Sequence, residues 1–129
     1  MKTSFLITHF IVPLFILVIL DIGYLYLLSD YFSSVVRSIQ GSGITLRFIS
    51  IIFIYLILSF AVYYFVLKNN RPTYDAFILG VVIYSVFDLT NHTIFKKWAI
   101  PLILIDSLWG GVLLYITTFI TKFISKKIA

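Results

Sequence analysis

Two long apolar runs in the second half of the chain decide its fold: residues 74–95 read YDAFILGVVIYSVFDLTNHTIF and residues 100–121 read IPLILIDSLWGGVLLYITTFIT. A helix needs about 20 residues to cross the hydrocarbon core of a bilayer, and each run is long enough. The apolar residues follow one another without the alternation of a strand, and only helices or closed barrels satisfy the backbone in lipid. The two runs therefore predict neighbouring transmembrane helices joined by a short connection.

Two further apolar runs precede this pair, so the sequence predicts an all-α integral membrane bundle of four transmembrane helices, in a single domain over residues 1–129. We expect the first run to be an uncleaved span, because it continues without a small-residue cleavage site. Between the first two runs, Gly41-Ser42-Gly43 predicts a turn, and residues 30–39 suit a short interfacial helix. The expected spans are Phe5–Leu28, Leu46–Leu67, Tyr74–Phe95 and Ile100–Thr121.

The composition agrees with a membrane location. Hydrophobic residues make up 61% of the chain and charged residues 12%, about half of the roughly 25% that a soluble domain carries. The net charge of +5 belongs mainly to the connections between apolar runs. We therefore expect membrane lipid as a partner and no nucleic acid. The chain has no cysteine, which excludes disulfides and thiolate metal sites.

The basic residues are unequally shared between the two ends of the predicted bundle. Short cytoplasmic connections carry an excess of Lys and Arg, so the larger set predicts that both termini are cytoplasmic. The sequence leaves open which membrane holds the protein. The end with the termini has Lys2, Lys68, Arg71, Lys122, Lys126 and Lys127, and the other has Arg37, Arg47, Lys96 and Lys97.

Three of the five acidic residues, Asp21, Asp88 and Asp106, lie inside apolar runs. A carboxylate near the membrane centre costs roughly 3 kcal/mol. Each aspartate stands six or seven residues from the outer end of its span, which is about 10 Å at 1.5 Å per residue. We therefore expect one buried polar cluster at a shared depth. Because three carboxylates cannot all stay charged so close together, at least one should hold a proton.

Side chains that can donate hydrogen bonds share the helix faces of these aspartates. Residues three or four apart lie on one face of a helix. On this basis the second span is expected to contribute Ser50 and Tyr55, with Arg47 reaching inward, whereas Trp98 beside two lysines indicates an interfacial anchor. The candidate ligand-binding or proton-binding residues are Asp21, Tyr24, Asp88, Asn91, His92, Asp106 and Trp109.

Three interpretations of the aspartates stay open. They form a site for a proton, an ion or a small polar solute, as expected for intramembrane ionisable residues, and proton-coupled transport is the favoured function. Alternatively, they are interhelical glue in a structural or assembly subunit of a larger membrane complex, aided by small residues such as Ala76, Gly80, Ser107 and Gly111. The third interpretation, an intramembrane metal-dependent enzyme, rests on Asp88 and His92 at i and i+4.

The sequence favours a protein that is not an enzyme. It contains neither a His-Glu-x-x-His nor a Gly-x-Ser-x-Gly pattern. We therefore assign no catalytic residue, no metal site and no cofactor. Four short helices enclose little volume, so a homodimer or a larger membrane complex is the expected setting for transport.

The second half of the chain resembles domain-of-unknown-function family 2177, a family of small predicted membrane proteins. The resemblance is carried by Phe87-Asp88-Leu89-Thr90-Asn91, then Trp98 and Pro101, then Asp106-Ser107-Leu108-Trp109-Gly110. Leu20-Asp21 matches a family pair in the first span. The resemblance implies a membrane protein with four spans and brings no activity with it.

The chain departs from the family pattern at three places. Tyr24 stands where the family usually has Trp, and the family's Trp-Pro pair is split here by Ala99 and Ile100. His92 replaces a residue that is usually apolar. The last departure implies that a metal-binding role for His92 is not a family trait.

Overall fold

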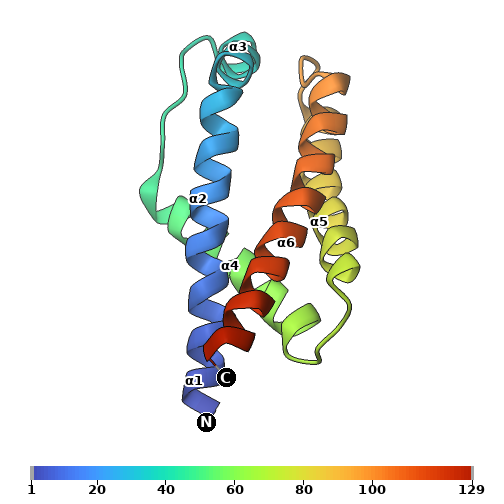
Figure 1. The fold of residues 1–129 in the computed structure, drawn as a ribbon. Helices are drawn as coiled ribbons and strands as arrows, with labels where there is room; N and C mark the ends of the chain where they lie inside the picture. Colours follow the sequence, from blue (N-terminus) through green and yellow to red (C-terminus); the bar gives the residue numbers. More distant parts are fainter. Residues whose placement is uncertain (1, 129) are drawn as a thin grey trace.

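The computed structural model describes residues 2–128, which form four long helices with both ends of the chain on the same side (Figure 1). Four helices are long and apolar enough to cross a membrane, and the described residues contain no strand, which confirms the predicted all-α membrane fold. The elements are α1 (Lys2–Leu6), η1 (Ile7–Ile11), α2 (Val12–Leu27), α3 (Ser29–Gln40), α4 (Phe48–Val62), η2 (Tyr63–Leu67), α5 (Thr73–Ile94) and α6 (Ile100–Ile128).

The helix α6 continues seven residues beyond the expected end of the fourth span at Thr121. Residues 122–128 contain no glycine or proline that would stop a helix. The 29 residues of α6 extend over about 43 Å at 1.5 Å per residue. This exceeds a hydrocarbon core of about 30 Å, so the lysine-bearing end of α6 extends into the headgroup region.

The helices α5 and α6 form a tightly packed antiparallel hairpin (Figure 1). Glycines from both helices meet along it: a Cβ atom on Gly80 would overlap the carbonyl oxygen of Gly110, and one on Gly110 would overlap the ring of Tyr84. A Cβ atom on Gly111 would lie 2.7 Å from a methyl group of Val81. Close backbone contact across small residues is a common way to join helices in lipid. We call this contact the glycine seam.

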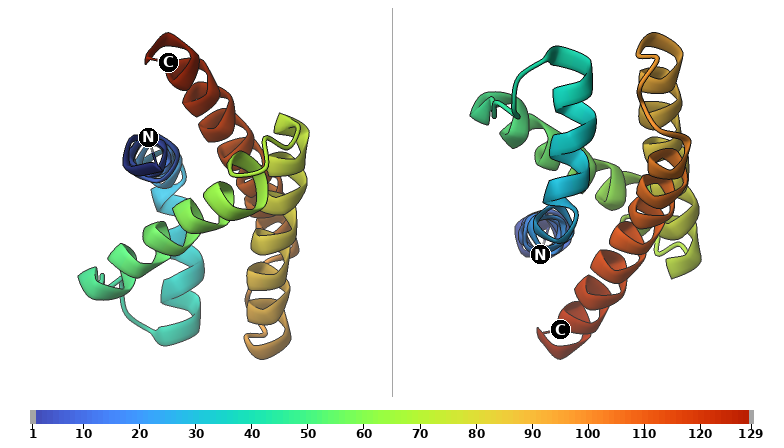
Figure 2. Two further views of the ribbon diagram at one scale, coloured as in Figure 1. Left: turned by 90° about the horizontal axis from the view of Figure 1, so that it is seen from below. Right: turned by 90° about the horizontal axis from the view of Figure 1, so that it is seen from above.

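The first and second spans cross at a steep angle, with α4 running obliquely from mid-height towards the end that holds the termini (Figures 1 and 2). Each span contains one π-helical turn, η1 or η2. The turn η1 lies just before Pro13, which has no N–H and is tolerated in the first turn of α2. Within η1 the carbonyl of Phe10 accepts a hydrogen bond of 2.5 Å from the hydroxyl of Ser59. This bond ties α4 to the first span.

The amphipathic helix α3 packs at the end of the bundle opposite the termini (Figure 1). Its buried Val35, flanked by Tyr31 and Phe32, packs with Trp98 and Leu102 in a small apolar cluster. The predicted turn after it begins at Gly41, whose φ of 76° is in the left-handed region that glycine adopts without strain. The helix α3 therefore contacts the end of the connection between α5 and α6 at Trp98, and the first turn of α6.

Candidate functional site

Asp21 of α2 is buried where three helices meet. Its Oδ1 accepts a hydrogen bond of 2.9 Å from the indole N–H of Trp109 on α6, and its Oδ2 accepts one from the hydroxyl of Tyr55 on α4. Both carboxyl oxygens therefore have a donor from this chain. The side chain of Asp21 links α2, α4 and α6.

Asp106 of α6 is also buried, one turn from Trp109. Its Oδ1 accepts a hydrogen bond of 3.0 Å from the hydroxyl of Tyr24. The ring of Tyr24 stacks on the indole of Trp109, with centroids 4.6 Å apart and an angle of 5° between the rings. Tyr24 and Trp109 thus connect Asp106 to Asp21 across the interface of α2 and α6.

Asp88 of α5 is fully buried, with 0% of its surface exposed. Its Oδ1 accepts a hydrogen bond of 3.2 Å from the indole N–H of Trp98. Its Oδ2 is buried and has no hydrogen-bond donor among the described residues. The carboxyl groups of Asp88 and Asp106, called the carboxyl pair below, lie within hydrogen-bonding reach of each other.

When Asp88 and Asp106 are both ionised, neither carboxyl group has an O–H that it can donate to the other. An ionised carboxylate is only an acceptor, whereas a protonated one can also donate. A hydrogen bond between Asp88 and Asp106 therefore requires a proton on one of them. The same proton would give the buried Oδ2 of Asp88 a hydrogen-bond partner, which no other side chain in residues 2–128 provides.

No basic side chain neutralises these aspartates in the part of the chain that the structure describes. The ion pair found there joins Arg71 and Asp75, in the connection before α5 and its first turn. Burying an unpaired charge in an apolar medium is costly. Fully ionised aspartates would therefore lack a compensating positive charge from residues 2–128.

The aspartates lie along a chain of contacts and do not surround one point. In spatial order, the residues that contact one another are Asp21, Trp109, Tyr24, Asp106, Asp88 and Trp98. Together with Tyr55, which binds Asp21, we call them the aspartate network. No three His, Asp or Glu side chains among the described residues are placed to hold a metal ion.

Two of the candidate residues lie outside the network. Asn91 is half-buried, and no hydrogen bond of its side chain is present within residues 2–128. His92 is exposed, and its Nδ1 lies 2.9 Å from the carbonyl oxygen of Trp98. His92 therefore contacts the backbone of a residue that binds Asp88, and it does not contact the carboxyl groups directly.

The expected contributions of the second span are partly wrong. Tyr55 binds Asp21, but Ser50 and Arg47 are exposed and do not reach the network. The reason is the path of the chain: residues 41–47 descend beside the bundle before α4 begins, so the first residues of α4 lie away from α6 (Figure 1). This descent is set by tertiary packing and has no signal in the apolar pattern.

The interpretation of Trp98 as an interfacial anchor is wrong. Only 8% of its surface is exposed, and its indole donates to Asp88. Its neighbours Lys96 and Lys97 are exposed, as an anchor segment would be. The difference arises because α3 folds over the connection and buries the indole. The sequence prediction missed Trp98 as a hydrogen-bond donor to Asp88.

Four apolar helices enclosing a network of buried aspartates define a small integral membrane protein. Comparison with known families gives the particular group. The sequence model of the family described as "Predicted membrane protein (DUF2177)" matches residues 6–123, so the chain belongs to this family. No curated protein and no solved structure matches the chain. The aspartates, with their donors, all lie within the matched region.

Proposed function

We propose that the chain binds and releases a proton at the carboxyl pair of Asp88 and Asp106, as the coupling site of a small-solute transporter. One observation carries the proposal: the two carboxyl groups are in reach of each other, and Oδ2 of Asp88 has no donor among the described residues. Intramembrane ionisable residues commonly form proton relays in transporters. The absence of a basic partner in residues 2–128 favours the proton as the balancing charge.

Release of the proton supplies a driving force for movement. Two carboxylates in contact repel each other more strongly in a low dielectric than in water. Deprotonation therefore favours separation of Asp88 from Asp106, and hence a change in the packing of α5 against the outer part of α6. In the proposed mechanism this change exposes a solute site to one side of the membrane.

Infrared spectroscopy tests whether the pair holds a proton. We expect the wild-type protein in detergent to show the carbonyl stretch of a protonated carboxylic acid at neutral pH, shifted in D₂O. Asp88→Asn should remove this band. Asp75→Asn is the matched control, because Asp75 is ion-paired with Arg71 near the end of the bundle, and its replacement should leave the band unchanged. A spectrum without the band in wild-type protein would contradict proton storage.

Transport needs a separate measurement. Purified protein is reconstituted in vesicles that contain a pH-sensitive dye, and an imposed pH gradient is followed with and without candidate solutes. We expect solute-dependent proton movement by wild type and by Asp75→Asn, and none by folded Asp88→Asn. If the infrared band is present but no solute moves protons, the pair is a proton site without the proposed transport role.

A structural or assembly role is the second candidate, and the environment of Asp21 favours it. Both oxygens of Asp21 accept hydrogen bonds from other helices, so this residue needs no ligand. If the whole network is glue, Asp88→Asn will lower the melting temperature to a similar extent at every pH. In that case the function depends on a partner in a larger complex or on a homodimer.

We also propose that both termini face the cytoplasm. The two termini lie at one end of the bundle (Figure 1), and six of the ten basic residues belong to that end. The natural chain has no cysteine, so single cysteines at Asn69 and Ser42 can be labelled selectively with a membrane-impermeant maleimide. In intact cells we expect labelling at position 42 and not at position 69. The reverse pattern would invert the orientation.

A further inference from the structure

A groove lies between η2 and the first half of α5, away from the aspartate network. Its volume is about 360 Å³, and none of the network residues lines it. The groove is shallow and open along most of its surface. The groove is lined by Phe65, Val66, Arg71, Asp75, Ile78, Leu79 and Val82.

The lining of the groove changes from charged to apolar along α5. Arg71 and Asp75 lie at one end, in the connection and the first turn of α5. Val82 is seven residues further along the helix, about 10 Å at 1.5 Å per residue. The groove therefore begins at the level of the lipid headgroups and continues among apolar side chains towards the hydrocarbon core.

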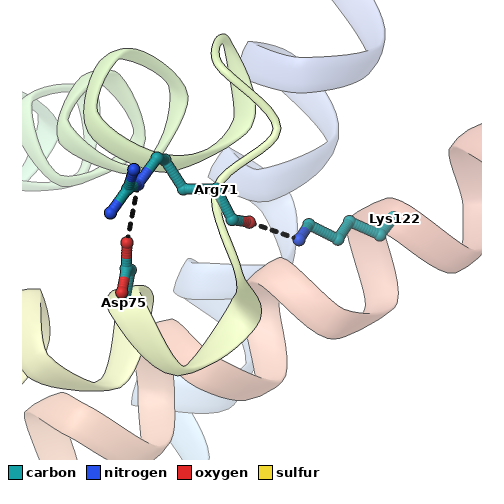
Figure 3. Close-up of polar contacts among 3 residues, drawn as sticks. All are labelled: Arg71, Asp75 and Lys122. Carbon is teal, nitrogen blue, oxygen red and sulfur yellow. Dashed lines mark hydrogen bonds and ion pairs between the residues drawn. The ribbon is translucent and has the colours of Figure 1, made fainter.

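The guanidinium group of Arg71 is fixed at the charged end with most of its donors free. Its Nε donates to Oδ2 of Asp75 over 2.8 Å, and 58% of the side chain is exposed. Lys122 of α6 donates to the backbone carbonyl of Arg71 over 2.6 Å, which holds the connection in place (Figure 3). The terminal amino groups of Arg71 have no partner among the described residues, so they remain available to a ligand.

The charge around this end of the groove is positive. Lys68 stands three residues before Arg71 and lies over the exposed ring of Tyr64, 4.8 Å from its centroid. Lys122 donates to the backbone carbonyl of Arg71, so both lysines lie beside this connection, while the charged residues that line the groove itself are Arg71 and Asp75. An anionic group is the complementary ligand, and arginine binds phosphate through paired N–H donors.

We infer that this groove binds one anionic phospholipid. Its phosphate contacts the terminal amino groups of Arg71, and one acyl chain lies along Phe65, Ile78 and Val82. The positive charge near the Arg71 end of the groove selects an anionic headgroup, and the apolar lining contacts the acyl chain attached to that headgroup. The inference is independent of proton binding by Asp88 and Asp106, because the two sites share no residue.

The test measures thermal unfolding of the full chain in detergent during titration with phosphatidylglycerol. A ligand that binds the folded state raises its stability by mass action. We expect phosphatidylglycerol to raise the melting temperature at lower concentration than phosphatidylcholine. Arg71→Gln should increase the half-maximal lipid concentration by about tenfold or more, since charge-assisted hydrogen bonds are the stronger class. Arg37→Gln on the exposed face of α3 makes the same charge change and should have no such effect.

A second pair of variants tests the apolar part of the groove. Val82→Phe fills the groove with a larger side chain, whereas Val86→Phe places the same chain one turn further along α5, where no groove residue stands. Both positions are exposed to lipid, so both variants should fold. Only Val82→Phe should weaken the response. Equal responses to both lipids, an unchanged response of Arg71→Gln, or the same effect from inorganic phosphate alone would each overturn the inference.

Discussion

The two halves of the bundle are held together by different forces. Residues 73–128 form a hairpin whose backbones touch at the glycine seam, with Gly80 against Gly110. The first span contacts its neighbours through apolar side chains such as the fully buried Leu17 and also through the hydrogen bonds that Asp21 accepts from Tyr55 and Trp109. Lipid tails are as apolar as the helices, so burial of apolar surface gives little attraction between spans. Close backbone contact and hydrogen bonds therefore take its place.

The glycine seam and the aspartate network differ in how far their helices can move relative to each other. The seam has no free space, because an added Cβ atom on Gly80 meets backbone and one on Gly110 or Gly111 meets packed side chains at under 3 Å. The aspartate network is held by side-chain hydrogen bonds and not by backbone contact. We therefore expect the seam to act as the rigid part of α5 and α6, and the network further out to be the part that responds to a proton.

The largest effect is expected from Gly80→Ala, which breaks the seam. The new Cβ atom would overlap the carbonyl oxygen of Gly110, and backbone cannot rotate away. Forced overpacking of this kind costs about 3 kcal/mol. Gly23→Ala is the control, since no atom lies within 4 Å of its added Cβ atom, and alanine improves helix propensity by up to about 1 kcal/mol. Reversible unfolding in mixed micelles gives both values, and equal values would contradict the seam.

A smaller effect is expected from Tyr55→Phe, which removes one donor from Asp21 without changing ring volume. Interhelical hydrogen bonds in membrane proteins contribute about 0.6 kcal/mol on average and about 1.7 at most. We expect about 1 kcal/mol of destabilisation, because Asp21 stays buried with an unpaired oxygen. Tyr26→Phe on the exposed face of α2 should have no measurable effect. A loss as large as that of Gly80→Ala would mean that hydrogen bonds, and not the seam, dominate.

Trp98→Phe tests the outer part of the network. The variant keeps a ring next to Phe87 but loses the hydrogen bond of 3.2 Å to Asp88. This bond is longer than those to Asp21, so we expect its loss to account for about 0.5 kcal/mol, in addition to the packing lost when the smaller ring replaces the buried indole. We also expect a shifted carbonyl stretch of the protonated carboxyl pair in the infrared spectrum, because Asp88 loses a donor. An unchanged spectrum would show that Trp98 does not bind Asp88 in solution.

The smallest effect is expected from Asp75→Asn. The pair of Asp75 and Arg71 is spaced i,i+4, and the arginine is 58% exposed. Exposed pairs of this kind contribute about 0.3–0.5 kcal/mol. The difference from wild type should shrink further in high salt, because exposed charges are screened. A loss above that of Tyr55→Phe would show that this end of the hairpin is held electrostatically.

Helix periodicity was sufficient to predict that several of these side chains lie close together. The equal depths of Asp21, Asp88 and Asp106 and the spacing of Tyr24 and Trp109 follow from residue counts along straight helices. The structure brings these five side chains into one network. Whether they bind a proton or a ligand stays a prediction.

The remaining parts of the site depend on connections. The helix α3 buries Trp98, and the descending residues 41–47 place Tyr55, not Arg47, near Asp21. No periodic pattern specifies how a connection packs on a helix that is far away in the sequence. Asn91 shares the turn of Asp88 but finds no partner in the described chain, because a shared face does not determine what lies opposite.

The sequence by itself determined that this protein crosses the membrane four times, that it belongs to its family and that carboxyl groups lie within the bilayer. These properties follow from local hydrophobicity, length and motif, because the bilayer imposes the same requirement on every apolar segment. Only the tertiary structure decided which donor binds each carboxyl group, why Asp88 faces Asp106 and where the groove at Arg71 lies. Those features depend on helix rotation, crossing angle and loop path, which are set by contacts between residues far apart in the chain.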